Sequence, residues 1–521
     1  MDQNQRADMA LASMGYKSQL PRHLSTMSIL GLSLAIMAVP FGLSTTLYIS
    51  LTNGQAVTVL YGWILVSCVS LCIAASLAEI CAVYPTAGGV YYWSAMLSPP
   101  RWAPLVSFID GWLTLVGNWT VTLSINFSGA QLILSAGTIF DEHFVPTAWQ
   151  TVLCFWAVML LCASVNAFAS RRLDAINKVC IYWTAAAVVL ILVTLLSTAK
   201  GGRRPASFVF AHYDPSVSGW PSAWSFFVGL LQAAYTLTGY GMVAVMCEET
   251  SAPEREVPKA MVLSVLAAGL TGILYLVPLL FVLPDVASLL AAPGSQPIGL
   301  IFKTVTGSSA GGFCLLLLIL GIFVFSGIGA LTAASRCTYA FARDGAIPGH
   351  QVWRKVNRAL DVPLYALGLS TLIDCLLGLI YLGSPAAFNS FTGVATICLS
   401  SSYAVPVLVN LLRRRATVRR SPFPLGTVLG YLLNGVCVVF ILFSLAIFCM
   451  PVQLPVDPGS MNYASVVFAG FAAIAFVWYF TYARKNFTGP PVRADVTLGV
   501  SCDEDSDEHK ARAEVPAVLE K

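Results

Sequence analysis

Residues 27–50 read MSILGLSLAIMAVPFGLSTTLYIS and contain no charged side chain. A helix needs about 20 apolar residues to cross a hydrocarbon core about 30 Å thick, and this stretch is long enough. Its middle carries Pro40 and Gly42, and a proline inside a helix removes one backbone hydrogen bond. The stretch therefore predicts a membrane-spanning helix that is interrupted at mid-depth.

Similar apolar stretches recur along the whole chain of 521 residues. The sequence is 57% hydrophobic and only 10% charged, whereas a soluble domain has about 25% charged residues. We predict an all-α polytopic membrane protein with about twelve transmembrane helices. The predicted spans are 27–50, 58–83, 104–136, 148–168, 176–198, 223–246, 260–283, 311–342, 364–382, 387–411, 426–449 and 464–483.

The placement of basic residues supports this count and orients the chain. If the amino terminus lies in the cytosol, all but four of the 29 Lys and Arg residues fall on the cytosolic side, as the positive-inside rule predicts. The four exceptions are Lys200, Arg203, Arg204 and Lys303. We therefore expect both termini in the cytoplasm. The predicted regions are a cytoplasmic tail (1–26), a transporter core of ten spans (27–411), two further spans (412–485) and a disordered cytoplasmic tail (486–521).

The sixth span carries a second candidate interruption. Residues 235–242 read YTLTGYGM, with two glycines around an aromatic residue at mid-depth. Interrupted helices at equivalent positions of two repeats often mark a solute site; the alternative is that proline and glycine only allow close helix packing. Freed amides would bind a carboxylate or another polar head group, and the tyrosines would close over an apolar group or stack on a cation. The predicted solute-binding residues of spans one and six are Val39, Pro40, Phe41, Gly42, Tyr235, Thr238, Gly239, Tyr240 and Gly241.

Three longer motifs carry a family resemblance. Residues 78–93 read AEICAVYPTAGGVYYW, residues 248–250 read EET, and residues 335–348 read SRCTYAFARDGAIP. In this order the motifs resemble the amino acid–polyamine–organocation (APC) superfamily of transporters, and in particular its fungal amino acid/choline branch, which includes choline and γ-aminobutyrate permeases. The resemblance covers about residues 25 to 485 and is specific for the family rather than for the solute.

The resemblance implies a LeuT-type fold, in which spans 1–5 and 6–10 form inverted repeats and two helices follow. It also implies a solute site between spans one and six, lined by spans three and eight, and transport coupled to protons. Asn118 in span three and Ser326 in span eight are then candidate cavity residues, although helix–helix contacts would also explain them. The sequence departs from the family at Val39-Pro40-Phe41-Gly42, where the family has a glycine-rich break.

Five charged residues are candidates for proton coupling or gating, namely Glu79, Glu248, Glu249, Arg336 and Asp374. Glu79 would relay a proton or gate the cytoplasmic mouth, or it would pair with Arg336 or Arg343. Glu248 and Glu249 would bind a proton or anchor the loop that follows span six. Asp374 is the most deeply placed acid, and such residues usually mark a pathway, so it would carry the proton or pair within the bundle.

Other classes of function find no support in the sequence. It has no HExxH or phosphate-binding loop motif and no Cys/His cluster, so we expect neither an enzyme nor a metal or cofactor site. A soluble basic face for nucleic acid is also missing. The hypothesis is a proton-coupled secondary transporter for an amino acid, γ-aminobutyrate, choline or a polyamine in the plasma membrane, with the vacuolar membrane left open. The alternatives are an exchanger or exporter of a related amine, and a receptor or sensor that binds without transport.

Overall fold

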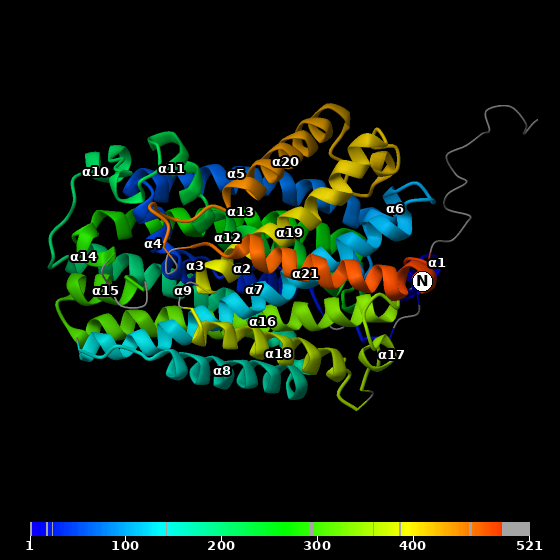
Figure 1. Ribbon diagram of the computed structural model, residues 1–521, viewed down its shortest axis with the longest axis horizontal. Helices are drawn as coiled ribbons and strands as arrows, with labels where there is room; N and C mark the ends of the chain where they lie inside the picture. Colours follow the sequence, from blue (N-terminus) through cyan, green and yellow to red (C-terminus); the bar gives the residue numbers. More distant parts are fainter. Residues whose placement is uncertain are drawn as a thin grey trace, which may run out of the picture.

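The computed structural model describes residues 3–16, 19–22, 24–141, 143–290, 296–357, 359–384, 387–457 and 461–491. Twelve helical segments in these ranges are long and apolar enough to cross a membrane, and no strand is formed within them. The spans run side by side along the long axis of the molecule (Figure 1). The predicted all-α polytopic fold with twelve spans is therefore confirmed.

The spans differ in length and regularity. In chain order they are α2 (Thr26–Met37) with α3 (Val39–Thr45), α5 (Gln55–Val83), α7 (Ala103–Phe140), α8 (Ala148–Phe168), α9 (Leu173–Thr198), α11 (Ser222–Gly229) with α12 (Leu231–Leu237) and the 3₁₀ helix η3 (Thr238–Glu249), α13 (Pro253–Phe281), α16 (Ser309–Arg343), α18 (Leu364–Gly378) with η5 (Leu379–Leu382), α19 (Ala387–Leu412), α20 (Thr427–Ile447), and α21 (Ala464–Trp478) with the π-helix η7 (Tyr479–Ala483) and α22 (Arg484–Asn486).

Shorter helices lie outside the spans; the first of them precedes the first span and the others connect consecutive spans. They are α1 (Gln3–Ser13), α4 (Leu47–Thr52), α6 (Gly89–Leu97), α10 (Ala206–Ala211), α14 (Val286–Leu290), α15 (Ile298–Thr306), α17 (His350–Trp353) and the 3₁₀ turns η1 (Ser170–Arg172), η2 (Ser216–Ser218) and η6 (Val418–Arg420). The first span was expected to continue to residue 50, but it ends at Thr45 and α4 follows. The hydroxyls of Thr45 and Thr46 donate to carbonyls of the preceding turn, and such bonds bend helices.

Equivalent spans of the two predicted repeats pack against each other. The first span contacts the sixth (α2 with η3), the second contacts the seventh (α5 with α13), the third contacts the eighth (α7 with α16) and the fourth contacts the ninth (α8 with α18). A pseudo-two-fold axis in the membrane plane produces such pairing. Of the two remaining spans, α20 contacts α19 and α5, and α21 contacts α19 and α7.

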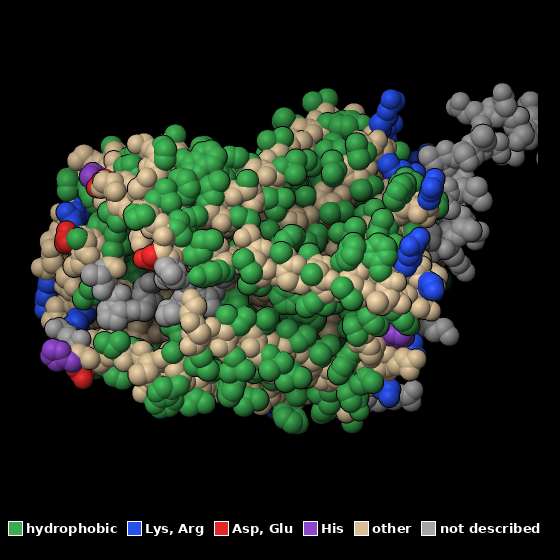
Figure 2. Space-filling model, in the orientation of Figure 1, with side chains coloured by type: hydrophobic (Ala, Val, Ile, Leu, Met, Phe, Trp, Pro, Cys, Tyr) green, Lys and Arg blue, Asp and Glu red, His purple; other side chains and the backbone are tan. Residues whose placement is uncertain are grey.

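The surface of the molecule separates into a broad hydrophobic band and two polar ends. Lys and Arg side chains gather at the end where the amino terminus lies (Figure 2). At this end the described part of residues 3–24, which we call the arm, packs on the bundle. Leu11, Tyr16 and Leu20 of the arm are buried to 2%, 6% and 3% exposure. We call this side of the bundle the arm end. Residues 492–521 of the predicted carboxyl-terminal tail lie outside the described residues.

Candidate functional site

The first span is broken at Ala38. The helix α2 ends at Met37, Ala38 adopts the left-handed conformation with φ 40° and ψ 52°, and α3 starts at Val39. Pro40 has no N–H for the carbonyl of Ile36, so the α-helix cannot pass through this point unbroken. Neither Ile36 nor Met37 receives a backbone N–H from α3 among the described contacts. The carbonyl end of α2 is thereby left open inside the bundle.

The sixth span changes its helix type instead of breaking. Its α-helix gives way at Thr238 to the 3₁₀ helix η3, which continues to Glu249. A 3₁₀ helix still bonds its backbone groups internally, three residues apart. The sequence predicted free amides around Tyr235–Met242, and this part of the prediction is wrong. The tighter helix brings the backbone at Gly239 close to span one, where an added Cβ would lie 2.5 Å from Ile36 Cγ2.

A closed cavity lies where these two spans meet α7 and α16, and we call it the central cavity. The space open to the centre of a water molecule is about 10 Å³, which corresponds to about one water. An amine-bearing solute therefore needs the surrounding helices to separate. The residues around the cavity are Ile36, Met37, Ala38, Phe41, Gly42, Val121, Ile125, Tyr235, Thr236, Gly239 and Ser326.

The polar groups of the central cavity are mostly hydrogen-bond acceptors. The hydroxyl of Ser326 donates to the Ile36 carbonyl at 3.4 Å, while Tyr235 Oη is buried and makes no hydrogen bond to a described residue. The described residues that line the cavity include no charged side chain. Free carbonyls at a helix carboxyl terminus carry partial negative charge, and the rings of Phe41 and Tyr235 offer π faces to a cation. This arrangement suits an ammonium group.

The structure distributes the predicted solute-binding residues over two places. Those that line the central cavity are Phe41, Gly42, Tyr235, Gly239 and Ser326; Val39 and Pro40 are buried beside it. Thr238 turns its hydroxyl back to the Ala234 carbonyl. Asn118 and Gly241 line a second small cavity together with Tyr403, whose ring packs on Tyr240 at 5.5 Å between centroids.

Asn118 brings a buried acceptor without a partner to this second cavity. Its Nδ2 donates to the Thr114 carbonyl at 2.8 Å, whereas Oδ1 has no hydrogen-bond partner among the described residues. On α7, Asn118 precedes Val121 by one turn on the side of the arm end. The second cavity therefore lies beside the central one in the direction of the arm end.

Sequence reasoning missed several apolar residues of the central cavity. Val121 and Ile125 of α7 line it, and their spacing of four residues places them on one face of the helix. The same face continues from Asn118, so the spacing could have revealed both residues. Ile36 and Met37 were also missed, because the sequence pattern marks Pro40 and Gly42 but carries no signal in the last turn of α2.

Four of the five candidates for proton coupling or gating lie in buried ion pairs at the arm end, namely Glu79, Glu248, Glu249 and Arg336. Arg343 donates to both carboxylate oxygens of Glu248, at 2.9 and 3.0 Å, and Arg336 pairs with Glu249 at 3.0 Å. The sequence suggested Arg336 or Arg343 as the partner of Glu79. This was wrong, because both are taken by span six.

The partner of Glu79 is Arg415, which follows span ten. Its Nη2 lies 2.7 and 2.6 Å from the two carboxylate oxygens, and the two side chains are exposed to only 2% and 4%. Arg415 is therefore buried against α5 instead of facing the lipid head groups.

Asp374 lies apart from both cavities and from these ion pairs. It is fully buried in α18, and neither of its carboxylate oxygens has a hydrogen-bond partner in the described part of the chain. Ser370, one turn earlier on the same face, hydrogen-bonds Thr338 of α16 at 2.9 Å and accepts from Trp119 of α7 at 3.2 Å. Asp374 therefore faces the helices that carry the central cavity without reaching the cavity itself.

The arm is held on the ion pairs by one carboxylate. Tyr16 donates to Asp344 at 2.9 Å and Tyr91 of α6 donates to it at 2.8 Å. The guanidinium of Arg343 lies 4.0 Å from the centre of the Tyr16 ring. The arm thus covers the junction of α6, η3 and α16, which is the place where a passage from the second cavity to the arm end would open.

Docking of the arm is expected to depend on pH. Burial raises the pKa of Asp344 to about 6, compared with about 3.9 for a carboxyl in water. The charge of Arg343 and the hydrogen bonds from Tyr91 and Tyr16 act in the opposite direction and offset part of this increase. Tyr92 and Glu248 also face this group. Protonation therefore favours the docked arm, which is held most firmly below about pH 4 and loosens as the pH rises through about 6. We expect docking to be tighter at pH 5 than at pH 7, by at most about tenfold, because Tyr91, Arg343 and Glu248 remain beside Asp344 when the arm leaves.

Hydrogen exchange of the arm peptide in lipid nanodiscs measures this effect directly. Protection of residues 3–16 should rise as the pH is lowered, after correction for the intrinsic exchange rate. Asp344→Asn removes the titrating proton and keeps the shape, so its arm should show the same protection at both pH values. A wild-type arm that loosens at pH 5 would contradict the assignment.

Comparison with known proteins identifies the family. The profile of the family described as "Amino acid permease" matches residues 24–471, which is most of the chain. The chain belongs to the amino acid permease family. The resemblance to the APC superfamily that the sequence motifs suggested is thereby confirmed, and the permease is a transporter rather than an enzyme.

Curated relatives of the permease differ in the solutes for which they are named. A polyamine transporter of Saccharomyces cerevisiae is 36% identical over 473 residues, which cover 90% of this chain and 76% of the relative. An amino-acid permease of Arabidopsis thaliana is 36% identical over 497 residues, with 92% and 95% covered. A choline transporter of Saccharomyces cerevisiae is 30% identical over 469 residues, with 90% and 83% covered. All three names refer to transporters of amine-bearing solutes.

Proposed function

We propose that the permease is a secondary active transporter that carries a small amine-bearing solute together with protons. The solute class comprises amino acids, γ-aminobutyrate, choline and polyamines. The observation that carries the proposal is the break at Ala38, which leaves the carbonyl end of α2 open at a closed cavity. These carbonyls favour a cationic group, and the named solutes of the relatives share one.

The solute would bind first in the central cavity. Its ammonium group would meet the carbonyls of Ile36 and Met37, Ser326 Oγ and the ring of Tyr235, all of which lie around the cavity. Gly42 and Gly239 allow spans one and six to approach closely here. Asn118 Oδ1 in the second cavity is a further acceptor on the way to the arm end. Rocking of the core would then expose the solute to each side in turn.

Among the predicted acids, Asp374 is our candidate for proton coupling. Glu79, Glu248 and Glu249 each pair with an arginine, so their charge is already compensated. Asp374 has no such partner among the described residues, and a lone acid at membrane depth commonly belongs to a proton pathway. Its neighbours Ser370, Thr338 and Trp119 connect α18 to α16 and α7, both of which line the central cavity.

The orientation follows from the positive-inside rule. Basic side chains gather at the arm end (Figure 2), so we assign this end, with both termini, to the cytoplasm. We place the protein in the plasma membrane on the basis of the family resemblance. In this orientation the arm and the ion pairs form the inner gate of the permease.

Uptake into proteoliposomes tests the proposal. Purified permease is reconstituted, and radiolabelled amino acids, γ-aminobutyrate, choline and polyamines are offered with and without an inward proton gradient at a clamped membrane potential. We expect at least one solute to accumulate roughly tenfold more with the gradient than after a protonophore is added, because each unit of ΔpH is worth about 1.4 kcal/mol. Asp374→Asn should abolish accumulation and retain counterflow of labelled solute.

The remaining outcomes would contradict parts of the proposal. Uptake that ignores the gradient would exclude proton coupling. Exchange of labelled for unlabelled solute without net uptake would identify an exchanger. Saturable binding without flux would identify a sensor. Gly435→Ala is the matched control, because an added Cβ at this position meets no atom within 4 Å.

A further inference from the structure

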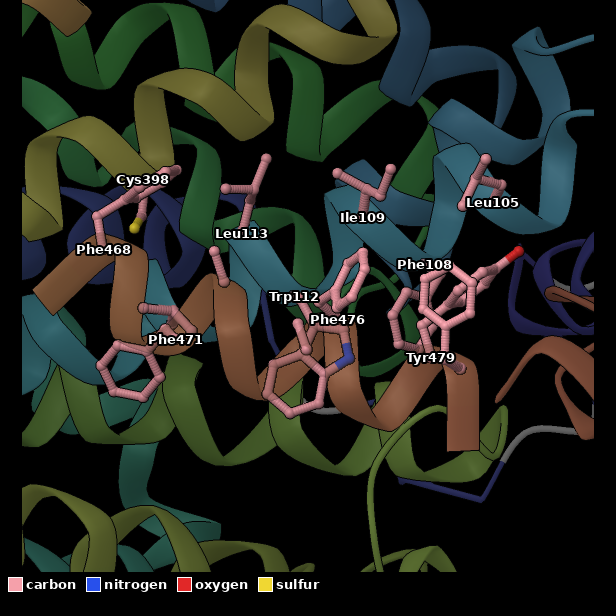
Figure 3. A pocket seen from close by; sticks show the side chains of 14 residues that line it. Leu105, Phe108, Ile109, Trp112, Leu113, Cys398, Phe468, Phe471, Phe476 and Tyr479 are labelled. Atoms are coloured by element: carbon pink, nitrogen blue, oxygen red, sulfur yellow. The ribbon is translucent and has the colours of Figure 1, made fainter. Parts of the chain in front are cut away.

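A deep apolar groove runs along the outside of the core between α7 and α21. Its volume is about 510 Å³, within the usual range of about 300–1,000 Å³ for sites of small molecules. Phe108 and Trp112 of α7 form one wall, and Phe471, Phe476 and Tyr479 of the last span form the other, with Ala472 between them. Figure 3 shows these side chains in the space between the two helices.

One polar group in the groove has no partner. The indole N–H of Trp112 is buried and makes no hydrogen bond to any described residue, although the side chain is only 7% exposed. The other fully buried indoles, Trp63, Trp93 and Trp119, all donate to protein oxygen atoms. Buried tryptophan N–H groups usually find an acceptor, and leaving a buried donor unpaired destabilises a protein. The indole nitrogen lies among the ring side chains of the groove (Figure 3) and has almost no accessible surface of its own, so a ligand oxygen would satisfy it by entering between these rings.

The groove has an interfacial end and a hydrocarbon end. Phe108 packs on Tyr479 at 5.2 Å between centroids, and Arg484 and Lys485 follow Tyr479 by little more than one turn. Aromatic and basic residues in this order mark the boundary between head groups and hydrocarbon. From there the groove extends along α7 from Leu105 to Val116, about 16 Å at 1.5 Å per residue, which is about half of a hydrocarbon core.

A ligand for this groove needs one acceptor oxygen at the level of Trp112 and a flat apolar body that lies along the aromatic walls. The described residues that line the groove include no charged side chain, so a phosphate or ammonium head group would find no partner. A sterol has a single uncharged hydroxyl and a rigid ring system that stacks on aromatic side chains. We propose that the groove is a sterol-binding site in which the sterol hydroxyl accepts a hydrogen bond from Trp112.

The site also touches the arm end of the bundle. Trp112 contacts Phe341 edge to face at 6.4 Å, and Phe341 packs on Tyr91 at 5.0 Å. Tyr91 donates to Asp344, which holds the arm. A bound sterol would therefore stiffen the aromatic contacts behind this carboxylate. The binding proposal itself does not depend on the solute or on its coupling to protons.

A second apolar groove on the bundle provides an internal control. It lies between α5 and α20, has a volume of about 530 Å³ and is also apolar, with Leu65, Leu432 and Gly435 among its residues. It contains no tryptophan among the described residues. A ligand attracted by apolar surface alone would occupy both grooves, whereas the proposed sterol would prefer the groove with the indole.

Photo-crosslinking of a sterol to the full-length permease in nanodiscs tests the proposal. A photoreactive ergosterol analogue is activated by light, and labelled peptides are mapped by mass spectrometry. We expect labelling of the α7 and α21 peptides that unlabelled ergosterol competes away. Trp112→Phe keeps a ring and removes the donor, so labelling should fall about fivefold, the equivalent of one hydrogen bond. Ala472→Phe fills the groove and should reduce labelling more than tenfold, whereas Gly435→Phe in the second groove should leave it unchanged.

Several results would overturn the assignment. Labelling that is equal in the two grooves, or that Ala472→Phe does not reduce, would exclude a specific sterol site. Equal competition by a phospholipid would identify an ordinary annular lipid, and crosslinks from α21 to a second copy would identify a dimer contact. Thermal denaturation of each variant shows that it is folded, and labelling is normalised to folded protein.

Discussion

Glu79→Ala is expected to lower the free energy of unfolding by about 3–5 kcal/mol, which is the usual cost of removing one partner from a buried ion pair. The change leaves Arg415 charged and only 3% exposed. It also removes the acceptor for the Leu425 N–H at 3.0 Å. Arg415 retains its bonds to the carbonyls of Gly426 and Thr427, but these are neutral and do not compensate its charge. Glu79 makes three hydrogen bonds to residues between α19 and α20, two to Arg415 and one to Leu425. Glu79→Ala removes all three at once.

The loss of stability is measured by heating the purified protein in detergent. The fraction that remains monodisperse at each temperature is the readout. Glu79→Gln is the matched variant, because it keeps the size of the side chain and loses only the charge; it should lie between wild type and Glu79→Ala. The double variant Glu79→Ala with Arg415→Leu removes both charges, so it should be more stable than Glu79→Ala alone. If the effects of the two substitutions simply added, the buried charge would not be the cause of the instability.

The number and the type of the spans could be predicted from the sequence, because each is a long apolar run that membrane thickness selects. The break at Ala38 could also be located, since Pro40 lacks the N–H that a continuous helix requires. The glycines of span six are different. Gly239 and Gly241 are compatible with an unwound segment and with a 3₁₀ helix, and the choice depends on contacts with Ile36 and Tyr403 that lie far away in the sequence.

The partners of the charged residues could not be predicted for a related reason. Topology places Glu79, Arg336, Arg343 and Arg415 at one end of the bundle, but it does not give the rotation of each helix about its axis. That rotation decides that Glu79 faces Arg415 while span six takes the other two arginines. The groove beside Trp112 depends in the same way on where α21 docks, and no local sequence pattern specifies that position.

Gly239→Ala is expected to reduce solute uptake roughly 5- to 150-fold without loss of folded protein. An added Cβ at this position would lie 2.5 Å from Ile36 Cγ2, inside the contact between spans one and six. Overpacking of such a contact costs about 1–3 kcal/mol, and a change of 1.4 kcal/mol alters a population tenfold. The methyl group would force the two spans apart and depopulate the closed state, through which the solute has to pass.

Initial rates of uptake into proteoliposomes, normalised to monodisperse protein, measure this effect. Ile36→Ala shortens the side chain that the new methyl group would meet, so the double variant Gly239→Ala with Ile36→Ala should recover most of the lost rate. Gly435→Ala faces no atom within 4 Å and should match wild type. A double variant as slow as Gly239→Ala alone would show that the methyl group acts through the backbone of η3 rather than through the contact with Ile36. Recovery of uptake in the double variant would instead identify the close approach of spans one and six at Gly239 as a condition for transport. The rate lost to the methyl group on span six would then have been restored by removing atoms from Ile36 on span one.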